Sequence, residues 1–154
     1  MVNTLKYIGL TITLLFIGSL IQEYFFEWSF SQLKNEPVRI INRTISGSFH
    51  TRIFFVLSIG VIPLLYLIVK KITKLSFINQ GLIACGIILI SGFLFWQLRI
   101  FQLNRRLEKL PKQDIETQIS MDSLNFEQYL FIGLVVGTIL SILIFKNKNK
   151  TAMK

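Results

Sequence analysis

The 154-residue sequence contains little of what enzymes and redox proteins need: one cysteine, one histidine and eight acidic residues. A single cysteine excludes an intramolecular disulfide, a zinc site built on cysteines and a CxxC redox pair. Any acid–base or metal scheme must centre on His50 or do without histidine. No glycine-rich phosphate loop, nucleophile elbow or metal-ligand spacing occurs in the chain. The sequence therefore predicts no catalytic residue, no metal and no cofactor, and it favours a protein that is not an enzyme.

Charged residues are also scarce, at 16% of the chain against about 25% in an ordinary soluble domain. A disordered tail is excluded, because 52% of the residues are apolar. The net charge of +9 would suggest a nucleic-acid partner if the protein were soluble. The length of the apolar runs argues against nucleic acid and predicts membrane lipid as the surroundings.

Four long runs without charge account for this apolar content. A helix needs about 20 residues to cross roughly 30 Å of hydrocarbon, and each run approaches or exceeds that length. We predict an all-α integral membrane protein, one membrane domain with four transmembrane helices and two longer loops on one face. The spans are 5–26, 53–69, 75–98 and 128–145, the loops are 27–52 and 99–127, and the basic tail is 146–154. Lys6 before the first run would also suit a signal peptide, but Ile17 is a poor residue before a cleavage point, which favours an uncleaved span.

The distribution of lysine and arginine predicts the orientation. The N-terminus, the turn near residue 72 and the C-terminal tail share one face, with eight cations and no acid. The other face carries the remaining nine cations and all eight acids, at a lower density of positive charge. The positive-inside rule then places both termini in the cytoplasm and both loops outside. The abundance of Ile, Phe, Asn and Lys is typical of an AT-rich bacterial genome, so we expect a bacterial cytoplasmic (inner) membrane.

Small residues recur along the third and fourth runs. Helices in lipid associate through close packing of such residues. We predict a packing face in each run, which either joins two helices of this chain or binds another subunit. The members of this set are Gly133, Gly137, Ser141, Gly81, Cys85 and Gly92.

None of the four runs, the first of which lies between Lys6 and Glu23, contains Asp, Glu, Lys, Arg or His, although such residues usually mark ion pathways and proton relays. A transporter is therefore disfavoured. Pro63 lies midway along the second run and predicts a kink there, because proline removes a backbone hydrogen bond.

The two loops supply candidate contacts with lipid or a partner at the membrane surface. Trp28 and Phe30 belong to an aromatic group typical of the membrane interface. Pro37 and Gly47 suit the start and end of a short helix that presents Arg39 and Arg43 on one side. The remaining candidates for contact with lipid or a partner are His50, Arg52, Arg105 and Arg106.

The leading hypothesis is a non-catalytic accessory or scaffolding subunit of a larger membrane protein complex. The alternative is a small interfacial enzyme or lipid-handling protein acting on anionic headgroups through Arg39, Arg43, His50 and Arg52. A third possibility is a homo-oligomeric channel or transporter. Membrane lipid and other membrane subunits are thus the expected partners, and nucleic acid is not.

Overall fold

A computed structural model describes the backbone of residues 2–33, 40–41, 45–73, 78–109, 119–120 and 124–151. Side chains are described for 5–33, 49–73, 79–109 and 124–146. The elements are α1 (Val2–Ser31), β1 (Ile40–Ile41), α2 (Ile45–Gly60), α3 (Ile62–Thr73), α4 (Ile78–Glu108), β2 (Ile119–Ser120) and α5 (Phe126–Thr151).

Four helical segments are long and apolar enough to cross a membrane, which confirms the predicted all-helical class. They are Leu5–Ser31, Phe49–Thr73, Asn79–Glu108 and Phe126–Lys146. Each extends beyond the run from which it was predicted. The helix at the third run continues past its last apolar residue to Glu108, three residues before Pro111, which could not continue it.

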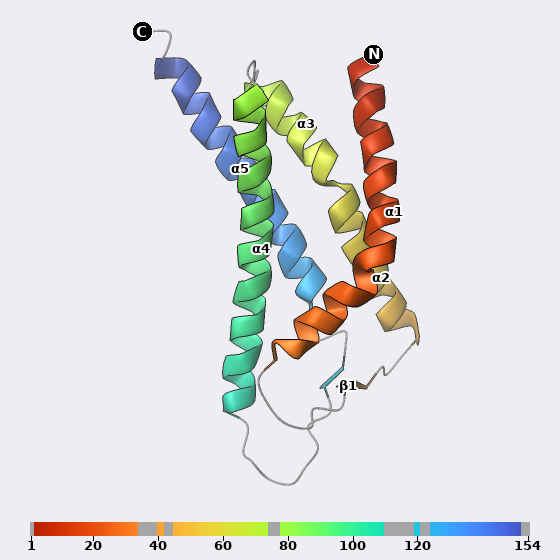
Figure 1. Ribbon diagram of the computed structural model, residues 1–154. Coiled ribbons are helices and arrows are strands. Elements are labelled where there is room, and N and C mark those ends of the chain that lie inside the picture. Colours follow the sequence, from red (N-terminus) through yellow and green to blue (C-terminus); the bar gives the residue numbers. More distant parts are fainter. Residues whose placement is uncertain are drawn as a thin grey trace.

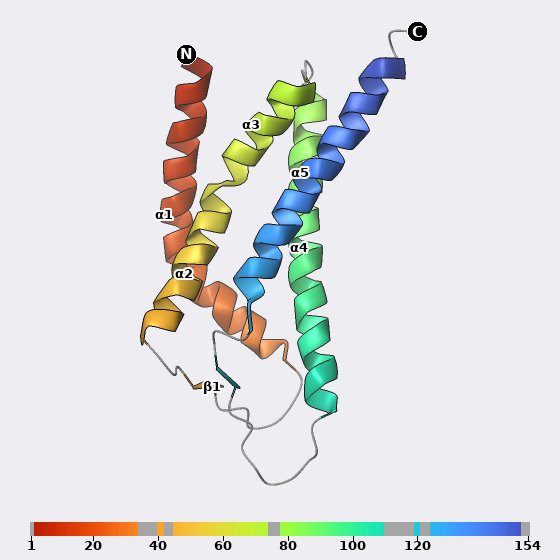
Figure 2. The same cartoon turned by 180° about the vertical axis from the view of Figure 1, so that it is seen from behind.

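The second segment is broken between α2 and α3, as Pro63 predicts. Val61 interrupts the helix. Its amide still donates to the Leu57 carbonyl at 2.9 Å, and its carbonyl accepts bonds from the amides of Leu64 and Leu65, both at 3.0 Å. Pro63 has no N–H to donate to the carbonyl of Ile59, so the helix restarts in a new direction. Figure 2 shows the change of direction between α2 and α3.

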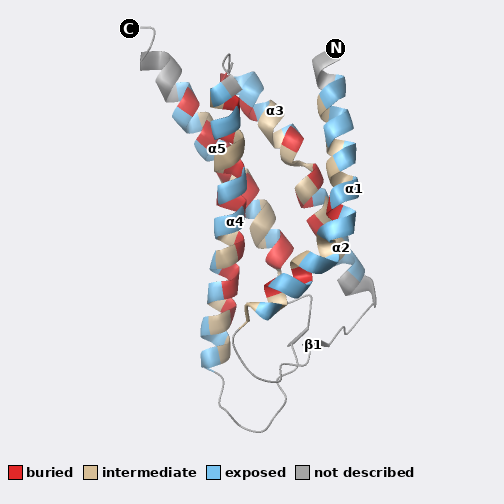
Figure 3. Ribbon diagram, viewed as in Figure 1, coloured by how far each residue is buried: buried red, intermediate tan, exposed pale blue. Residues whose placement is uncertain are grey.

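The helices form an open bundle in which α5 crosses closely against α4, while α1 packs against α2 and α3 (Figure 1). The N-terminal part of α1 stands away from α4, and its C-terminal part turns beneath the bundle toward α4 (Figures 1 and 2). Buried residues follow the inward faces of the helices (Figure 3). One cluster, near the turned end of α1, includes Phe26, Phe55 and Trp96. The other, toward the termini, includes Ala84, Ile88 and Leu134 between α4 and α5.

The two long connections meet through one short strand pair. Ile40 pairs with Ile119 and Ile41 with Ser120, in parallel. The predicted helix over 37–47 is therefore wrong at Ile40 and Ile41, where two β-branched residues pair with a strand from the other connection. A helix does begin at Ile45, but it is the start of α2. The rest of that prediction lies outside the described residues.

Candidate functional site

The small residues of α5 are packed against α4 within the chain. A Cβ placed on Gly137 would lie 2.8 Å from the Ile88 Cα and from the Ser91 Cβ. A Cβ on Gly133 would lie 2.6 Å from the Ser91 carbonyl oxygen. The Ser141 hydroxyl donates to the Ala84 carbonyl at 3.3 Å, one turn further along α5. These three positions allow the two backbones to approach closely, so this face of α5 is already occupied.

The predicted small-residue face of α4 divides between two neighbours. Gly92 faces α5, since a Cβ there would lie 2.8 Å from Leu134 Cδ2. Gly81 instead faces α3, where its nearest neighbour is the Tyr66 hydroxyl. Cys85 is a half-buried free thiol. Ala84 and Ser91 of α4 also contact α5. They lie next to the predicted positions Cys85 and Gly92 on the surface of α4.

The basic candidates that the structure describes do not converge on one site. Arg52 forms an ion pair with Glu23 at 3.4 Å, with the Arg52 side chain 43% exposed and the Glu23 side chain 67% exposed. His50 is exposed and stacks against Phe54, with ring centroids 6.3 Å apart. Arg105 lies over the Phe101 ring of its own helix, at 5.2 Å. Arg106 is exposed, and Arg39 and Arg43 lie outside the described residues.

The aromatic residues at the end of α1 contact other helices, while Trp28 remains about half exposed. Trp28 packs against Trp96 of α4, with ring centroids 4.7 Å apart. Phe30 makes an edge contact with Phe126 at the start of α5, at 5.8 Å. The predicted aromatic group therefore joins α1 to α4 and α5, which the sequence could not show because these residues are distant in the chain.

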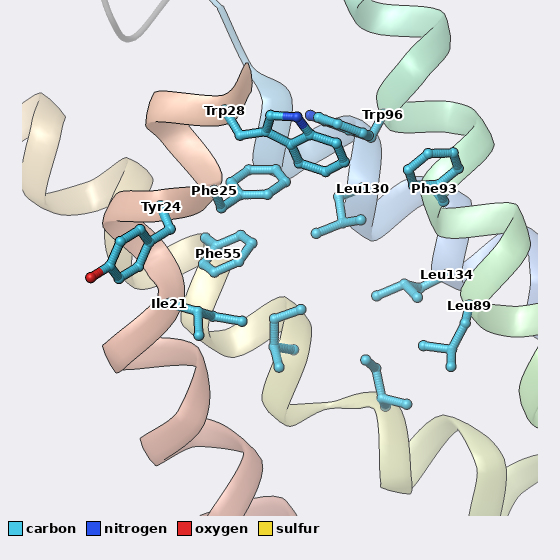
Figure 4. A pocket seen from close by; sticks show the side chains of 12 residues that line it. Ile21, Tyr24, Phe25, Trp28, Phe55, Leu89, Phe93, Trp96, Leu130 and Leu134 are labelled. Atoms are coloured by element: carbon cyan, nitrogen blue, oxygen red, sulfur yellow. The ribbon is translucent and has the colours of Figure 1, made fainter. Parts of the chain in front are cut away.

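Trp28 and Trp96, at the top of Figure 4, line one end of an apolar pocket between α1, α2, α3, α4 and α5. Its volume is about 470 Å³, within the range of roughly 300–1,000 Å³ found for small-molecule sites. Twelve residues line it: Ile21, Tyr24, Phe25, Trp28, Phe55, Ile59, Ile62, Leu89, Phe93, Trp96, Leu130 and Leu134. The pocket opens at the gap between α1 and α4, where Leu89 and Phe93 remain about half exposed.

Every lining side chain is aliphatic or aromatic, and few carry a polar atom. The Trp96 indole N–H donates to the Ser29 hydroxyl at 3.0 Å, outside the lining. The Tyr24 hydroxyl points away from the centre of the pocket (Figure 4). The arrangement can hold an apolar group, but the lining offers no nucleophile or carboxylate to transform one.

Polar contacts follow directly beyond the tryptophan end. Gln97 donates to the Gln32 side chain at 3.1 Å, and Asn104 donates to the Gln32 carbonyl at 3.2 Å. These bonds tie the end of α1 to α4. Polar side chains thus lie beyond the tryptophan end of the pocket, while the lining itself is apolar throughout.

A buried arginine lies near this end, and the sequence analysis missed its importance. Arg99 is only 5% exposed, and its Nε donates to the Leu124 carbonyl at 2.7 Å. Its guanidinium lies 5.0 Å from the centre of the Tyr129 ring. Arg99 directly follows the third apolar run, so it was assigned to a loop. The 3.6-residue pattern after residue 98 predicts that the helix continues toward Pro111, and Arg99 lies one turn before Leu103 of that pattern.

Within the side chains that the structure describes, no group of three or more His, Cys, Asp or Glu is placed to hold a metal ion. Comparison with protein-family models, with curated proteins and with solved structures finds no match to this chain. The candidate site is therefore the apolar pocket, interpreted from its own geometry.

Proposed function

We propose that this chain is a non-catalytic, lipid-handling membrane protein that binds the apolar chain of an amphiphile in the pocket between α1 and α4. The pocket itself is the observation that carries the proposal. Its volume suits a ligand, its lining is apolar throughout, and it opens sideways, where lipid would lie if the helices cross a membrane.

The two ends of the pocket suggest how an amphiphile would lie. Leu89 precedes Trp96 by two helical turns, which is about 10 Å along α4. The apolar end near Leu89 and Leu134 suits a hydrocarbon chain. The tryptophan end borders the amides of Gln32 and Gln97, and indole rings favour the level of lipid headgroups. The headgroup would therefore sit at the tryptophan end.

The chain carries its own reporter for this binding, because its only two tryptophans both line the pocket. A brominated single-chain lipid, added to the purified protein in detergent, should quench tryptophan fluorescence in a saturable way. Linear quenching without saturation, equal to that of free tryptophan in the same micelles, would contradict a defined site.

A matched pair of double variants tests where the chain binds. Ile21→Phe with Leu89→Phe adds bulk to two partly exposed lining positions on α1 and α4, and should weaken binding about tenfold or more. Leu20→Phe with Leu82→Phe makes the same change at exposed positions on the same helices outside the lining. Equal affinity of the two double variants would refute the pocket as the binding site.

A second candidate function is the accessory subunit predicted from the sequence. It is favoured by α1, where 6% of the most apolar stretch is buried, against 33% in each of the other three segments. The small residues of α5 (Gly133, Gly137 and Ser141) no longer support it, because they pack against α4. Purification of the tagged chain in mild detergent, followed by mass spectrometry, tests this candidate. A stoichiometric partner would support it, and a lone chain that retains lipid would leave the pocket as its principal feature.

A further inference from the structure

The end of the bundle opposite the tryptophans carries positive charge without compensating acids. The N-terminal end of α1, the C-terminal end of α3 and the C-terminal end of α5 lie at this end (Figure 1). Lys6, Lys70, Lys71 and Lys146 are all exposed. In the sequence, no acidic residue occurs in 1–22, 37–107 or 128–154.

Two helices bring a lysine and a tyrosine together at this end. The Lys70 ammonium of α3 donates to the Tyr7 hydroxyl of α1 at 3.3 Å and lies 5.8 Å from the centre of that ring. Tyr66, one turn before Lys70, lies beside Tyr7 with ring centroids 6.1 Å apart. Its hydroxyl reaches α4 at Gly81. The Lys70 ammonium therefore lies against Tyr7 at the surface, and the ring of Tyr7 lies beside Tyr66, which packs toward α4.

The hydrogen-bonding capacity of this pair suits a phosphate. An ammonium has three N–H donors, and the contact with Tyr7 uses one of them. The Tyr7 hydroxyl accepts that bond, so its own hydrogen is available to donate. The two groups therefore present adjacent donors to one acceptor, and the cation next to Tyr7 in sequence, Lys6, adds positive charge.

We propose that Lys70 and Tyr7 form a binding site for the headgroup phosphate of an anionic phospholipid, at the surface of the leaflet around the two termini. Basic sites between membrane helices bind such headgroups, and an adjacent lysine contributes attraction at the membrane surface. Tyrosine beside lysine is also typical of the interface level, where the phosphates lie. The site lies about 20 Å along α1 from the first residue of the pocket, Ile21, and is independent of it, although both require a membrane-inserted bundle.

The test compares binding of phosphatidylglycerol and phosphatidylcholine with matched acyl chains to the purified full-length protein, by native mass spectrometry. We expect preferential retention of phosphatidylglycerol. Lys70→Gln should weaken this binding about fivefold, and Tyr7→Phe about threefold. Lys71→Gln removes the same charge at the next position of α3, away from the contact with Tyr7, and should change the binding less than about twofold.

Three results would overturn the proposal. Equal losses of phosphatidylglycerol affinity in Lys70→Gln and Lys71→Gln would mean that the lipid is attracted by the positive charge of the surface as a whole. Equal retention of the two lipids, which both carry a phosphate, would mean that the site does not select an anionic headgroup. Displacement of the lipid by inorganic phosphate at a similar concentration would make it a site for soluble phosphate. Lys70→Arg retains the charge and should retain most of the affinity, while the elution volume of every variant shows whether the bundle is intact.

Discussion

Individual residues at the contact between α4 and α5 control how closely the two helices approach. At Gly137, for example, the neighbours of a Cβ are the backbone of Ile87 and Ile88 and the Cβ of Ser91, at 2.8–3.0 Å. None of these atoms is the end of a flexible side chain. The helices themselves would have to move apart to accommodate a methyl group.

Gly137→Ala should therefore destabilise the bundle by about 1–3 kcal/mol, as overpacking of a filled core does. Gly86→Ala in α4 is the matched control, because a Cβ there has nothing within 4 Å. The control should be neutral or stabilising by up to about 1 kcal/mol, since alanine favours helix over glycine. Thermal unfolding in detergent measures both, and similar curves for the two variants would contradict the close packing.

Arg99 fixes the chain where it enters α5. Its Nε donates a hydrogen bond to the Leu124 carbonyl. Asn125, which follows Leu124, adopts the left-handed conformation with φ 52°. A charged donor to a buried carbonyl contributes about 1.5–3 kcal/mol, so Arg99→Met should lower stability by that amount. Arg106→Met, at an exposed position on the same helix, should stay within about 0.5 kcal/mol. Equal unfolding transitions in the two variants would show that the Leu124 contact carries no stability.

At the scale of elements, hydrophobic pattern predicted the helices, and what it missed depends on distant partners. Four uncharged runs are enough to place four long helices, and Pro63 is enough to place the break. The strand pairing of Ile40 with Ile119 depends on a segment almost eighty residues away. The burial of Arg99 depends on the turn at Leu124. No local pattern encodes such partners.

The candidate site was harder to predict for the same reason. The residues of its lining come from five helices, and each is an ordinary apolar residue in its own segment. Trp28 was interpreted as an interface anchor because its partner, Trp96, lies on another run. The small residues of α5 were recognised from their spacing, but spacing alone could not say whether they face α4 or another protein.

Cross-linking between α4 and α5 tests directly whether the small residues of α5 face α4 or another protein. In a Cys85→Ser background, Gly92→Cys with Leu134→Cys places two thiols at the contact between α4 and α5, and shortening Leu134 leaves room for the new side chain, so mild oxidation should form a disulfide within one chain. Gly86→Cys with Leu134→Cys serves as the control, because Gly86 faces open space and should not cross-link within the chain. Peptide mapping identifies the bond. A disulfide-linked dimer in place of an internal bond would mean that this face of α5 binds a second copy.

The whole molecule separates its charges between its two ends. Tyr7 and Trp28 mark the two levels on α1, about 30 Å apart along the path of the bent helix (Figure 1). Lysines without acids surround the first level. At the second level, Glu23, Glu27 and Glu127 accompany the arginines. This asymmetry supports the proposal that the termini face the cytoplasm.

Labelling of single cysteines at the two ends tests both the insertion and its direction. In a Cys85→Ser background, Ser31→Cys lies at the end of α1 and Lys71→Cys near the end of α3, both at exposed positions at opposite ends of the bundle. A membrane-impermeant maleimide should label the first in intact spheroplasts and the second only after permeabilisation. The reverse pattern would invert the orientation and move the Lys70 site to the outer leaflet. Labelling of both in intact spheroplasts would mean that the helices do not cross the membrane, because the two positions could not then be separated by it.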